Sequence, residues 1–377
     1  MNIDYVTTYD ASDVHKWSGS GFFIAKALEA QAAELRYLGS LEEKPSLFLN
    51  LKSAIYRLGK KRFLSEREFS VASLYAKKLS GLIRADTDVI FSPGTLPIAL
   101  LKSSKPKVFY TDATFAGMIG FYDDFSGLAR ETIEHGNYLE QKALDSSRLA
   151  IYASDWAART AIEHYKADPG KIKVVPFGAN IVCNRDLEAI RAIVSNRSAS
   201  ECHLLFMGVD WHRKRGTFAI EVARILNKLG LKTILHVVGI RHLAADGLPD
   251  FVVDHGFLSK STRSGREKID SLMTACHYLL LPTKAECFGL VFCEAGSFGL
   301  PSIATNVGGI ATIIEEEING KTFSLSTPAL DYANYIFSSF RDRARYEELA
   351  CSSFDRYEKK LNWQVAGKTI MRLLKDL

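Results

Sequence analysis

One stretch of the sequence combines an apolar strand, a glycine-bearing turn, a helix and a second strand, and it constrains the fold more than any other. The apolar run Tyr278 to Leu281 precedes a turn that contains Gly289, and Pro301 precedes the strand-like run 302–305. Elements in this order are typical of a parallel α/β sheet. We therefore expect a parallel sheet in this half of the chain.

Two glutamates flank the start of the expected helix. Glu286 precedes it, and Glu294 lies about two turns inside it by the 3.6-residue period. We expect free backbone N–H groups around Phe288, Gly289 and Leu290, which together with the helix dipole suit a diphosphate. Glu294 can accept hydrogen bonds from sugar hydroxyls. The pattern predicts a site for a nucleotide diphosphate sugar.

These residues resemble the signature of the family-4 retaining glycosyltransferases of the GT-B fold, in which seven residues separate two glutamates. The segment 306–315 resembles the family's Gly-Gly turn, and the segment 206–216 resembles its basic phosphate loop. The resemblance is strong over the second half of the chain and weak over the first. It implies an α/β GT-B fold, with two facing Rossmann-like domains, parallel sheets and a C-terminal helix that crosses back to the first domain.

Length and strand pattern predict two domains. A chain of 377 residues with 47% hydrophobic residues exceeds a usual single core and can bury two. Expected strands span 3–8, 88–92, 107–111, 149–154 and 172–176, then 204–207, 233–238, 251–255, 278–281 and 302–305. We expect an N-terminal acceptor-side domain, a hinge, a C-terminal nucleotide-sugar-binding domain and a final helix that packs back on the first domain, at residues 1–180, 181–202, 203–355 and 356–377.

Composition excludes several classes of protein. None of the six cysteines forms a Cys-x-x-Cys pair, which argues against a disulfide framework and a zinc cluster. The net charge of +5 suits anionic ligands or an anionic surface but falls short of the dense basic stripe of a nucleic-acid-binding protein. No run of about 18 apolar residues occurs. We expect a cytoplasmic protein, with peripheral contact to the inner face of the membrane as an alternative.

Basic residues after the strand 204–207 are candidates for stabilising the leaving diphosphate. Arg213 and Lys214 lie in the turn before a helix that begins near Gly216, although a solvated basic loop is the alternative. The family's arginine directly after the loop glycine Gly208 is Val209 here, so Arg213 takes that role. Gly239 is a further candidate for donor binding, together with Gly208.

The family resemblance implies roles for the two glutamates. Glu286 contacts donor-sugar hydroxyls near the anomeric carbon, and Glu294 binds the nucleotide ribose. The reaction that the resemblance implies is a front-face substitution, in which the leaving phosphate accepts the acceptor proton. No cofactor or metal is expected, because cationic side chains already neutralise the donor. Asp86 and Asp88 have the spacing of a metal-binding pair, but they are more simply a turn before a strand.

The first half offers weaker candidates. Trp17, Ser20 and Gly21 lie in a glycine-bearing segment that suits either a flexible loop over the donor or acceptor, or an ordinary turn at a helix start. Its match to a dinucleotide fingerprint fails at Ile24. Asp112 follows the strand 107–111, where it could orient the acceptor hydroxyl, assist proton removal, or cap the next helix.

A basic and apolar stretch spans residues 51–63. It could dock as an amphipathic helix on an anionic membrane that carries lipid-linked acceptors. The alternative is a solvated helix face over the domain core.

These patterns together predict a retaining, metal-independent glycosyltransferase of the hexosyltransferase type, acting in polysaccharide biosynthesis. It would move a sugar from a nucleotide diphosphate sugar to a hydroxyl of a glycan, a lipid-linked or a small-molecule acceptor. The alternatives are a GT-B sugar-nucleotide epimerase, a hydrolase, or a catalytically silent sugar-nucleotide-binding protein. A hydrolase is disfavoured because the segment 295–299 lacks the first glycine of a nucleophile elbow.

Overall fold

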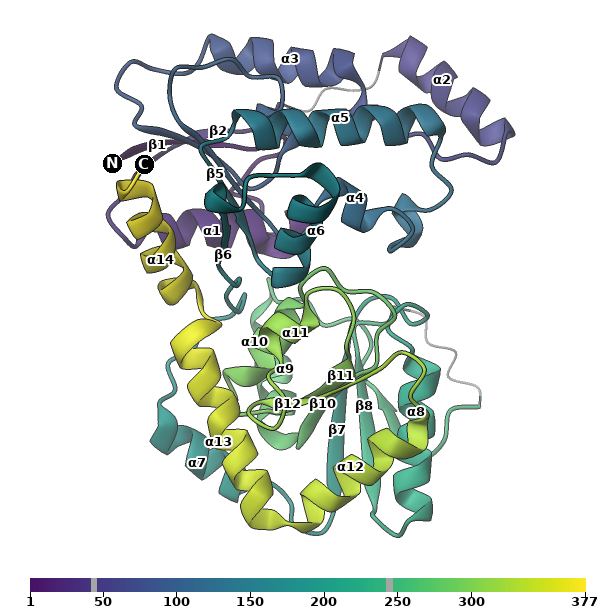
Figure 1. Cartoon of the computed structure of the whole chain (residues 1–377). Helices are drawn as coiled ribbons and strands as arrows, with labels where there is room; N and C mark the ends of the chain where they lie inside the picture. Colours follow the sequence, from purple (N-terminus) through teal and green to yellow (C-terminus); the bar gives the residue numbers. More distant parts are fainter. Residues whose placement is uncertain (42–45, 242–246) are drawn as a thin grey trace. The chain divides into compact units, whose positions relative to one another are not determined.

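The computed structural model describes residues 1–41, 46–241 and 247–377 and divides the chain into two compact units. Unit 1 comprises Met1–Asn180 and Trp363–Leu377, and unit 2 comprises Ile181–Asn362. Each unit is built on a six-stranded sheet in which all neighbouring strands run parallel (Figure 1). The predicted α/β class with two parallel sheets is confirmed.

The sheet of unit 1 has the strand order β2-β1-β3-β4-β5-β6. Its strands are β1 (Asn2–Val6), β2 (Glu34–Leu38), β3 (Val89–Ser92), β4 (Lys107–Thr111), β5 (Leu149–Tyr152) and β6 (Ile172–Val174). The chain runs from β1 to β2 on one side and then to β3 on the other side of β1. In open α/β sheets, ligands bind beyond the carboxyl ends of the strands at such a switch point.

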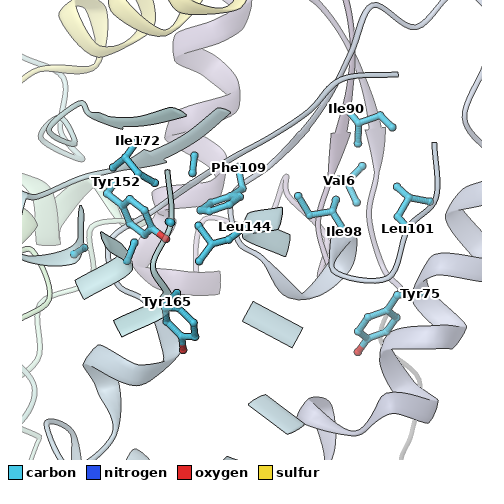
Figure 2. Close-up of a cluster of buried hydrophobic side chains, with 14 of the residues drawn as sticks. Val6, Tyr75, Ile90, Ile98, Leu101, Phe109, Leu144, Tyr152, Tyr165 and Ile172 are labelled. Carbon is cyan, nitrogen blue, oxygen red and sulfur yellow. The ribbon is translucent and has the colours of Figure 1, made fainter. Parts of the chain in front are cut away.

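Successive side chains of β1 point to opposite faces of this sheet, as the strand period of two requires. Tyr5 donates a hydrogen bond of 2.6 Å to the carbonyl of Gly21 in helix α1 (Ser20–Glu29). Val6 lies in an apolar cluster on the other face, with Leu144 of helix α5 (Arg130–Ser146) (Figure 2). The same cluster takes in residues of α3 (Phe69–Ser80) and α6 (Asp155–Tyr165).

The last helix, α14 (Trp363–Lys375), belongs to unit 1 and packs against α1. A Cβ atom on Gly367 would lie 2.5 Å from the carbonyl oxygen of Ala27, so the two helices approach at backbone contact. Asn180, the last residue of the first segment, accepts a hydrogen bond of 2.8 Å from the Trp363 indole. The points at which the chain leaves unit 1 and returns to it are therefore tied together. The remaining α-helices described in this unit are α2 (Leu47–Leu58) and α4 (Phe115–Met118).

The sheet of unit 2 has the strand order β12-β11-β10-β7-β8-β9. Its strands are β7 (Cys202–Met207), β8 (Thr233–Val238), β9 (Val252–Asp254), β10 (Tyr278–Leu281), β11 (Ser302–Thr305) and β12 (Gly320–Phe323). Its helices are α7 (Leu187–Ser195), α8 (Gly216–Lys228), α9 (Arg263–Ala275), α10 (Leu290–Gly296), α11 (Ile310–Ile313), α12 (Ala329–Arg341) and α13 (Arg343–Lys360). Strand β7 lies between β8 and β10, so the switch point of this sheet is between β7 and β10.

Some boundaries differ from those expected. The expected hinge, 181–202, belongs to unit 2 and contains α7, which packs against α13. The expected final helix from residue 356 is divided, because α13 ends at Lys360 in unit 2 and only α14 joins unit 1. The edge strands β2 and β12 were not predicted, since their partly exposed side chains form no apolar run.

Candidate functional site

The candidate site of unit 2 is assembled from the loops that follow β7 and β10. The first loop carries Arg213 and Lys214, and the second carries Glu286. Both loops leave the carboxyl ends of adjacent parallel strands at the switch point of the sheet. The structure thus brings together three residues that the sequence predicted separately.

Lys214 and Glu286 form a buried charged pair. Lys214 is only 6% exposed, and its Nζ donates a hydrogen bond to Oε2 of Glu286. Burial lowers the pKa of the Lys214 ammonium below its ordinary value, and the charge of Glu286 partly offsets this effect. The amine therefore lies against one carboxylate in a region of low dielectric.

Arg213 approaches the same carboxylate. Its Nη1 lies 3.6 Å from Oε2 of Glu286 and donates a hydrogen bond of 2.8 Å to the carbonyl of Ala285. The carbonyl of Arg213 in turn accepts a hydrogen bond of 2.8 Å from the N–H of Lys284. These contacts fix the loop after β7 against the loop after β10. The cationic groups of Arg213 and Lys214 therefore both lie near Oε2 of Glu286.

The β7 loop is also held from behind by aromatic packing. A Cβ atom on Gly216, the first residue of α8, would lie 2.1 Å from the Trp211 ring. Trp211 also packs edge-on against Phe206 of β7, with ring centroids 5.4 Å apart. Only glycine at position 216 lets the indole lie over the start of the helix.

Gly208 and Gly239 end neighbouring strands and touch each other. Gly239 has φ +101°, and a Cβ atom there would lie 2.6 Å from the Gly208 carbonyl oxygen. A Cβ atom on Gly208 would lie 3.1 Å from Cγ of Lys214. Gly208 therefore leaves room for the Lys214 side chain, and Gly239 for the Gly208 backbone. Contact of either glycine with a donor stays a prediction.

The turn before α10 is shaped by Gly289, which has φ +101°. A Cβ atom on this residue would lie 2.6 Å from the Phe292 ring and 3.1 Å from Cγ of Glu286. The N–H of Gly309, in the second predicted glycine turn, donates a hydrogen bond of 3.1 Å to the Glu286 carbonyl. That the backbone N–H groups at Phe288, Gly289 and Leu290 bind a ligand stays a prediction.

Glu294 is a buried carboxylate with one satisfied oxygen. It is 1% exposed, and its Oε1 accepts a hydrogen bond from Nζ of Lys260. Its Oε2 is buried without a hydrogen-bond partner in the described part of the chain. Sequence reasoning missed Lys260, because this lysine lies in a loop before α9 that contains no recognisable motif.

The candidates of unit 1 lie around the start of α1. Trp17, Ser18 and Gly19 have positive φ values of 46°, 55° and 84°, and Ser20 and Gly21 are the first residues of the helix. Asn180 Nδ2 donates a hydrogen bond of 2.8 Å to the carbonyl of Ser18. The segment therefore turns directly into the helix, and its contact with a donor or an acceptor stays a prediction.

Asp112 and Asp88 of unit 1 were predicted to have different roles, and their hydrogen bonding bears on each. Thr114, not Asp112, caps α4, since its side chain accepts a hydrogen bond from the N–H of Gly117. The acceptor role of Asp112 stays a prediction. Asp88 accepts a hydrogen bond of 2.8 Å from the N–H of Asn2, as expected for a turn that precedes a strand.

Within the ranges 1–41, 46–241 and 247–377, one group of residues could offer three ligand atoms to a metal ion. It comprises Glu68, Glu131 and His135 of unit 1. Nζ of Lys52 lies 3.1 Å from Glu68 and 2.7 Å from Glu131, and thus already supplies a positive charge. The arrangement fits an internal ion-pair cluster.

Helix α2 presents an apolar face to solvent. The side chains at positions 47, 48, 51, 55 and 58 lie within an arc of about 100° on a helical wheel. All are exposed: Leu47 by 89%, Phe48 by 69%, Leu51 by 62%, Ile55 by 59% and Leu58 by 87%. The stretch is therefore not an ordinary polar helix face over the core. None of the helices in the described residues has the length and apolarity that crossing a membrane requires.

Comparison with known proteins places these features in a wider group. Residues 201–338 match the family model for the glycosyl transferases group 1. The D-inositol 3-phosphate glycosyltransferase of Paenarthrobacter aurescens (strain TC1) is 25% identical over 224 residues, which are 56% of this chain and 53% of that protein. The chain thus spans about half the length of the curated relatives it matches.

Solved structures resemble the whole chain. Sucrose-phosphate synthase from Thermosynechococcus elongatus has a TM-score of 0.67 at 16% identity and covers 100% of this chain and 99% of its own. Anabaena Alr3699/HepE in complex with UDP and glucose has a TM-score of 0.63 at 16% identity and covers 100% of both chains. The chain therefore has the GT-B fold.

Proposed function

We propose that this protein is a retaining, metal-independent glycosyltransferase that moves a sugar from a nucleotide diphosphate sugar to an acceptor hydroxyl. The observation that carries the proposal is the buried Lys214–Glu286 pair, with Arg213 beside it, at the switch point of the unit 2 sheet. The match of residues 201–338 to the glycosyl transferases group 1 supports it.

The reaction breaks the bond between the anomeric carbon of the donor and the terminal phosphate oxygen. Negative charge then grows on the leaving diphosphate, and cations in a site of low dielectric stabilise it more strongly than water does. Lys214 and Arg213 supply these cations. The acceptor oxygen forms the new bond to the anomeric carbon on the same face, and its proton passes to the leaving phosphate.

Glu286 has two tasks in this scheme. In the free protein it accepts a hydrogen bond from the Lys214 amine, and its charge partly offsets the effect of burial, which lowers the pKa of that amine. When the diphosphate binds, it competes with Glu286 for Lys214, and the released carboxylate oxygen can accept hydrogen bonds from donor-sugar hydroxyls.

Glu294 binds the ribose of the donor. Its buried Oε2 needs a hydrogen-bond donor, and leaving such an oxygen unpaired is costly. A ribose hydroxyl supplies that donor. The neighbouring structure that contains UDP makes a uridine nucleotide the first to test.

The acceptor is a hydroxyl of a glycan, a lipid-linked or a small-molecule compound. Helix α2 favours an acceptor at an anionic membrane surface, because its exposed apolar face is followed by the exposed basic residues Lys60 and Lys61. Lys52 and Arg62 are not part of this surface, since they form ion pairs within unit 1.

The test is a panel of UDP-, GDP- and ADP-sugars with candidate acceptors, assayed with and without EDTA, followed by mass analysis of the products. The proposal expects transfer that resists EDTA, with retention at the anomeric carbon shown by NMR. Binding without turnover would identify a silent binding protein instead. Release of free sugar or isomerised donor in place of a glycoside would indicate a hydrolase or an epimerase.

A further inference from the structure

A pocket lies at the switch point of the unit 1 sheet. It has a volume of about 150 Å³ and is lined by the segments that follow β1 and β3 and by the end of β4. Arg67 of the short 3₁₀ helix Ser65–Arg67 and Glu140 of α5 complete its wall. All of these residues belong to unit 1, so the pocket is formed within one compact unit.

Arg67 is buried in this wall, and two of its three side-chain nitrogens lack a hydrogen-bond partner in the described chain. The residue is 8% exposed, and its guanidinium lies over the Phe115 ring, 4.4 Å from the centroid. Its Nε and Nη1 are buried and have no hydrogen-bond partner among residues 1–41, 46–241 and 247–377. Burial lowers the pKa of the Arg67 guanidinium, and the charge of Glu140 offsets this effect only in part. A buried cation whose N–H groups lack acceptors is costly.

Another buried arginine, Arg197, has a guanidinium that is fully hydrogen-bonded. Arg197 of unit 2 is 4% exposed, and its three side-chain nitrogens donate to the carbonyls of Met273, Thr274, Phe298 and Gly299 and to the Tyr346 hydroxyl. Arg197 therefore holds segments together. Arg67 has no comparable structural task.

The other polar groups of the pocket are also partly unsatisfied. Oε2 of Glu140 accepts a hydrogen bond of 2.6 Å from Thr95, whereas Oε1 is buried without a partner in the described chain. Ser92 is fully buried, and its Oγ likewise has no partner in those ranges. Burial raises the pKa of the Glu140 carboxyl above its ordinary value. The Ser92 hydroxyl can donate a hydrogen bond to a ligand in the pocket.

We propose that this pocket binds an oxyanion, a phosphate or a carboxylate, with Arg67 as its principal ligand and Ser92 as an additional donor. A planar guanidinium offers parallel N–H groups that match the oxygens of these anions. A neutral sugar hydroxyl would leave the charge of Arg67 unpaired.

The size of the pocket limits what enters it. A volume of about 150 Å³ corresponds to roughly five water molecules, which suits one charged head group. Sites for complete drug-sized ligands are typically about 300 to 1,000 Å³. The oxyanion is therefore one substituent of a larger molecule. In the proposed reaction this molecule is the acceptor, and that assignment rests on the proposed function, whereas anion binding does not.

Direct location of the anion tests the site without any assay of activity. Crystals of the full chain are soaked in sodium tungstate in the presence of UDP, which occupies the proposed donor site. We expect an anomalous peak within hydrogen-bond distance of Arg67 Nε or Nη1. A well-ordered pocket without tungstate, or a guanidinium paired directly with Glu140, would overturn the proposal.

Calorimetry then identifies the kind of oxyanion. Glycerol 1-phosphate, glycerate and glycerol are titrated into the wild-type protein with UDP present. We expect at least about a tenfold preference for one of the two anions over neutral glycerol, and loss of that preference in Arg67→Met. The exposed Arg130→Met variant is the control and should bind as the wild type does. Equal binding of glycerol and both anions would sink the idea.

Stability distinguishes a ligand-binding role from a structural one. Removing a buried charge whose Nε and Nη1 lack hydrogen-bond partners should leave the Tm of Arg67→Met unchanged or raise it, whereas Arg197→Met should lower the Tm because it leaves carbonyls unpaired. A loss of Tm in Arg67→Met equal to that in Arg197→Met would assign Arg67 to the framework. If Arg67→Met does not fold, Arg67→Met/Glu140→Gln removes both charges and is judged by the same binding criterion.

The binding and activity results are separable. If the anion binds at Arg67 but no sugar is transferred, the pocket stands and the proposed function falls. If neutral acceptors are glycosylated and no anion binds, the function stands and the pocket assignment falls.

Discussion

Lys214 donates a hydrogen bond to Glu286 although 72 positions separate the two residues in the chain. The bond joins the loop after β7 to the loop after β10, two strands that are neighbours in the sheet. One carboxylate thus holds the amine that is proposed to stabilise the leaving diphosphate, and donor binding would have to break this pair.

Lys214→Ala should lower kcat by about two orders of magnitude or more, because a charge that stabilises the transition state is removed. Lys214→Arg should retain part of the activity. Steady-state kinetics with the donor found by the panel would measure both. Lys284→Ala, an exposed lysine of the β10 loop, is the matched control and should behave as wild type. An unchanged kcat in Lys214→Ala would remove this lysine from the mechanism.

Glu294→Gln should weaken donor binding by about tenfold or more, because a charge-assisted hydrogen bond to the ribose becomes a neutral one. Lys260→Met should weaken it less, since Lys260 contacts the other carboxylate oxygen. Calorimetric titration of UDP and of 2′,3′-dideoxy-UDP would separate ribose contacts from phosphate contacts. Equal losses of affinity for both nucleotides in Glu294→Gln would contradict the assignment.

Four histidines line up across the unit 2 sheet and predict acid sensitivity. Nε2 of His236 lies 3.0 Å from Nδ1 of His203, and its Nδ1 lies 3.0 Å from Nε2 of His255. Burial lowers the pKa of His236 to about 4 and that of His277 to about 3. Protons therefore bind the unfolded chain more tightly, since its histidines titrate near about 6.5.

The contribution of neutral His236 and His277 to the free energy of unfolding is complete above about pH 6.5. It is lost progressively as the pH falls toward 4 and then 3. Urea unfolding at several pH values between 7.5 and 4.5 should show this decline. His236→Gln should reduce the dependence of the unfolding free energy on pH, whereas His164→Gln, at an exposed histidine, should leave that dependence unchanged. A slope that His236→Gln does not change would exclude this group as its source.

Replacing the apolar face of α2 should abolish binding to anionic vesicles without lowering the Tm. Leu47→Gln/Leu51→Gln/Leu58→Gln removes three exposed side chains, and exposed apolar residues contribute little to folding. Sedimentation with phosphatidylglycerol vesicles would measure the bound fraction of each variant. Leu330→Gln, an exposed leucine of unit 2, is the control.

Lys60→Gln/Lys61→Gln should weaken vesicle binding by about tenfold or more and reduce its dependence on salt, at about 1 kcal/mol per basic residue. Equal binding of wild type and the apolar variant would contradict membrane docking. Self-association of the wild type that the apolar variant abolishes would instead identify the face as a contact between copies.

Gly216→Ala should destabilise unit 2 by about 1 to 3 kcal/mol, because the new methyl group overlaps the Trp211 ring. Chemical unfolding followed by tryptophan fluorescence would measure it. Gly81→Ala, whose nearest neighbouring atom would be 3.8 Å away, is the control. If Gly216→Ala is as stable as wild type, the indole does not constrain the loop.

Much of the fold follows from local pattern. Central strands such as 204–207 and 278–281 are uninterrupted apolar runs because both faces of a parallel sheet are buried. The edge strands β2 and β12 lack this signal, since solvent reaches part of their side chains. Helix α7 was expected as a hinge because the sequence around it is polar.

By itself, the sequence determined two α/β halves and singled out Arg213, Lys214, Glu286 and Glu294 as site candidates, because strand period, turn glycines and fixed spacing are local properties. Only the tertiary structure decided that Lys260 pairs with Glu294 and that Arg67 and Glu140 share a pocket. These residues meet through the packing of segments distant in the chain. Burial, which makes an unpaired charge costly, is a property of the folded state, and no spacing in the sequence encodes it.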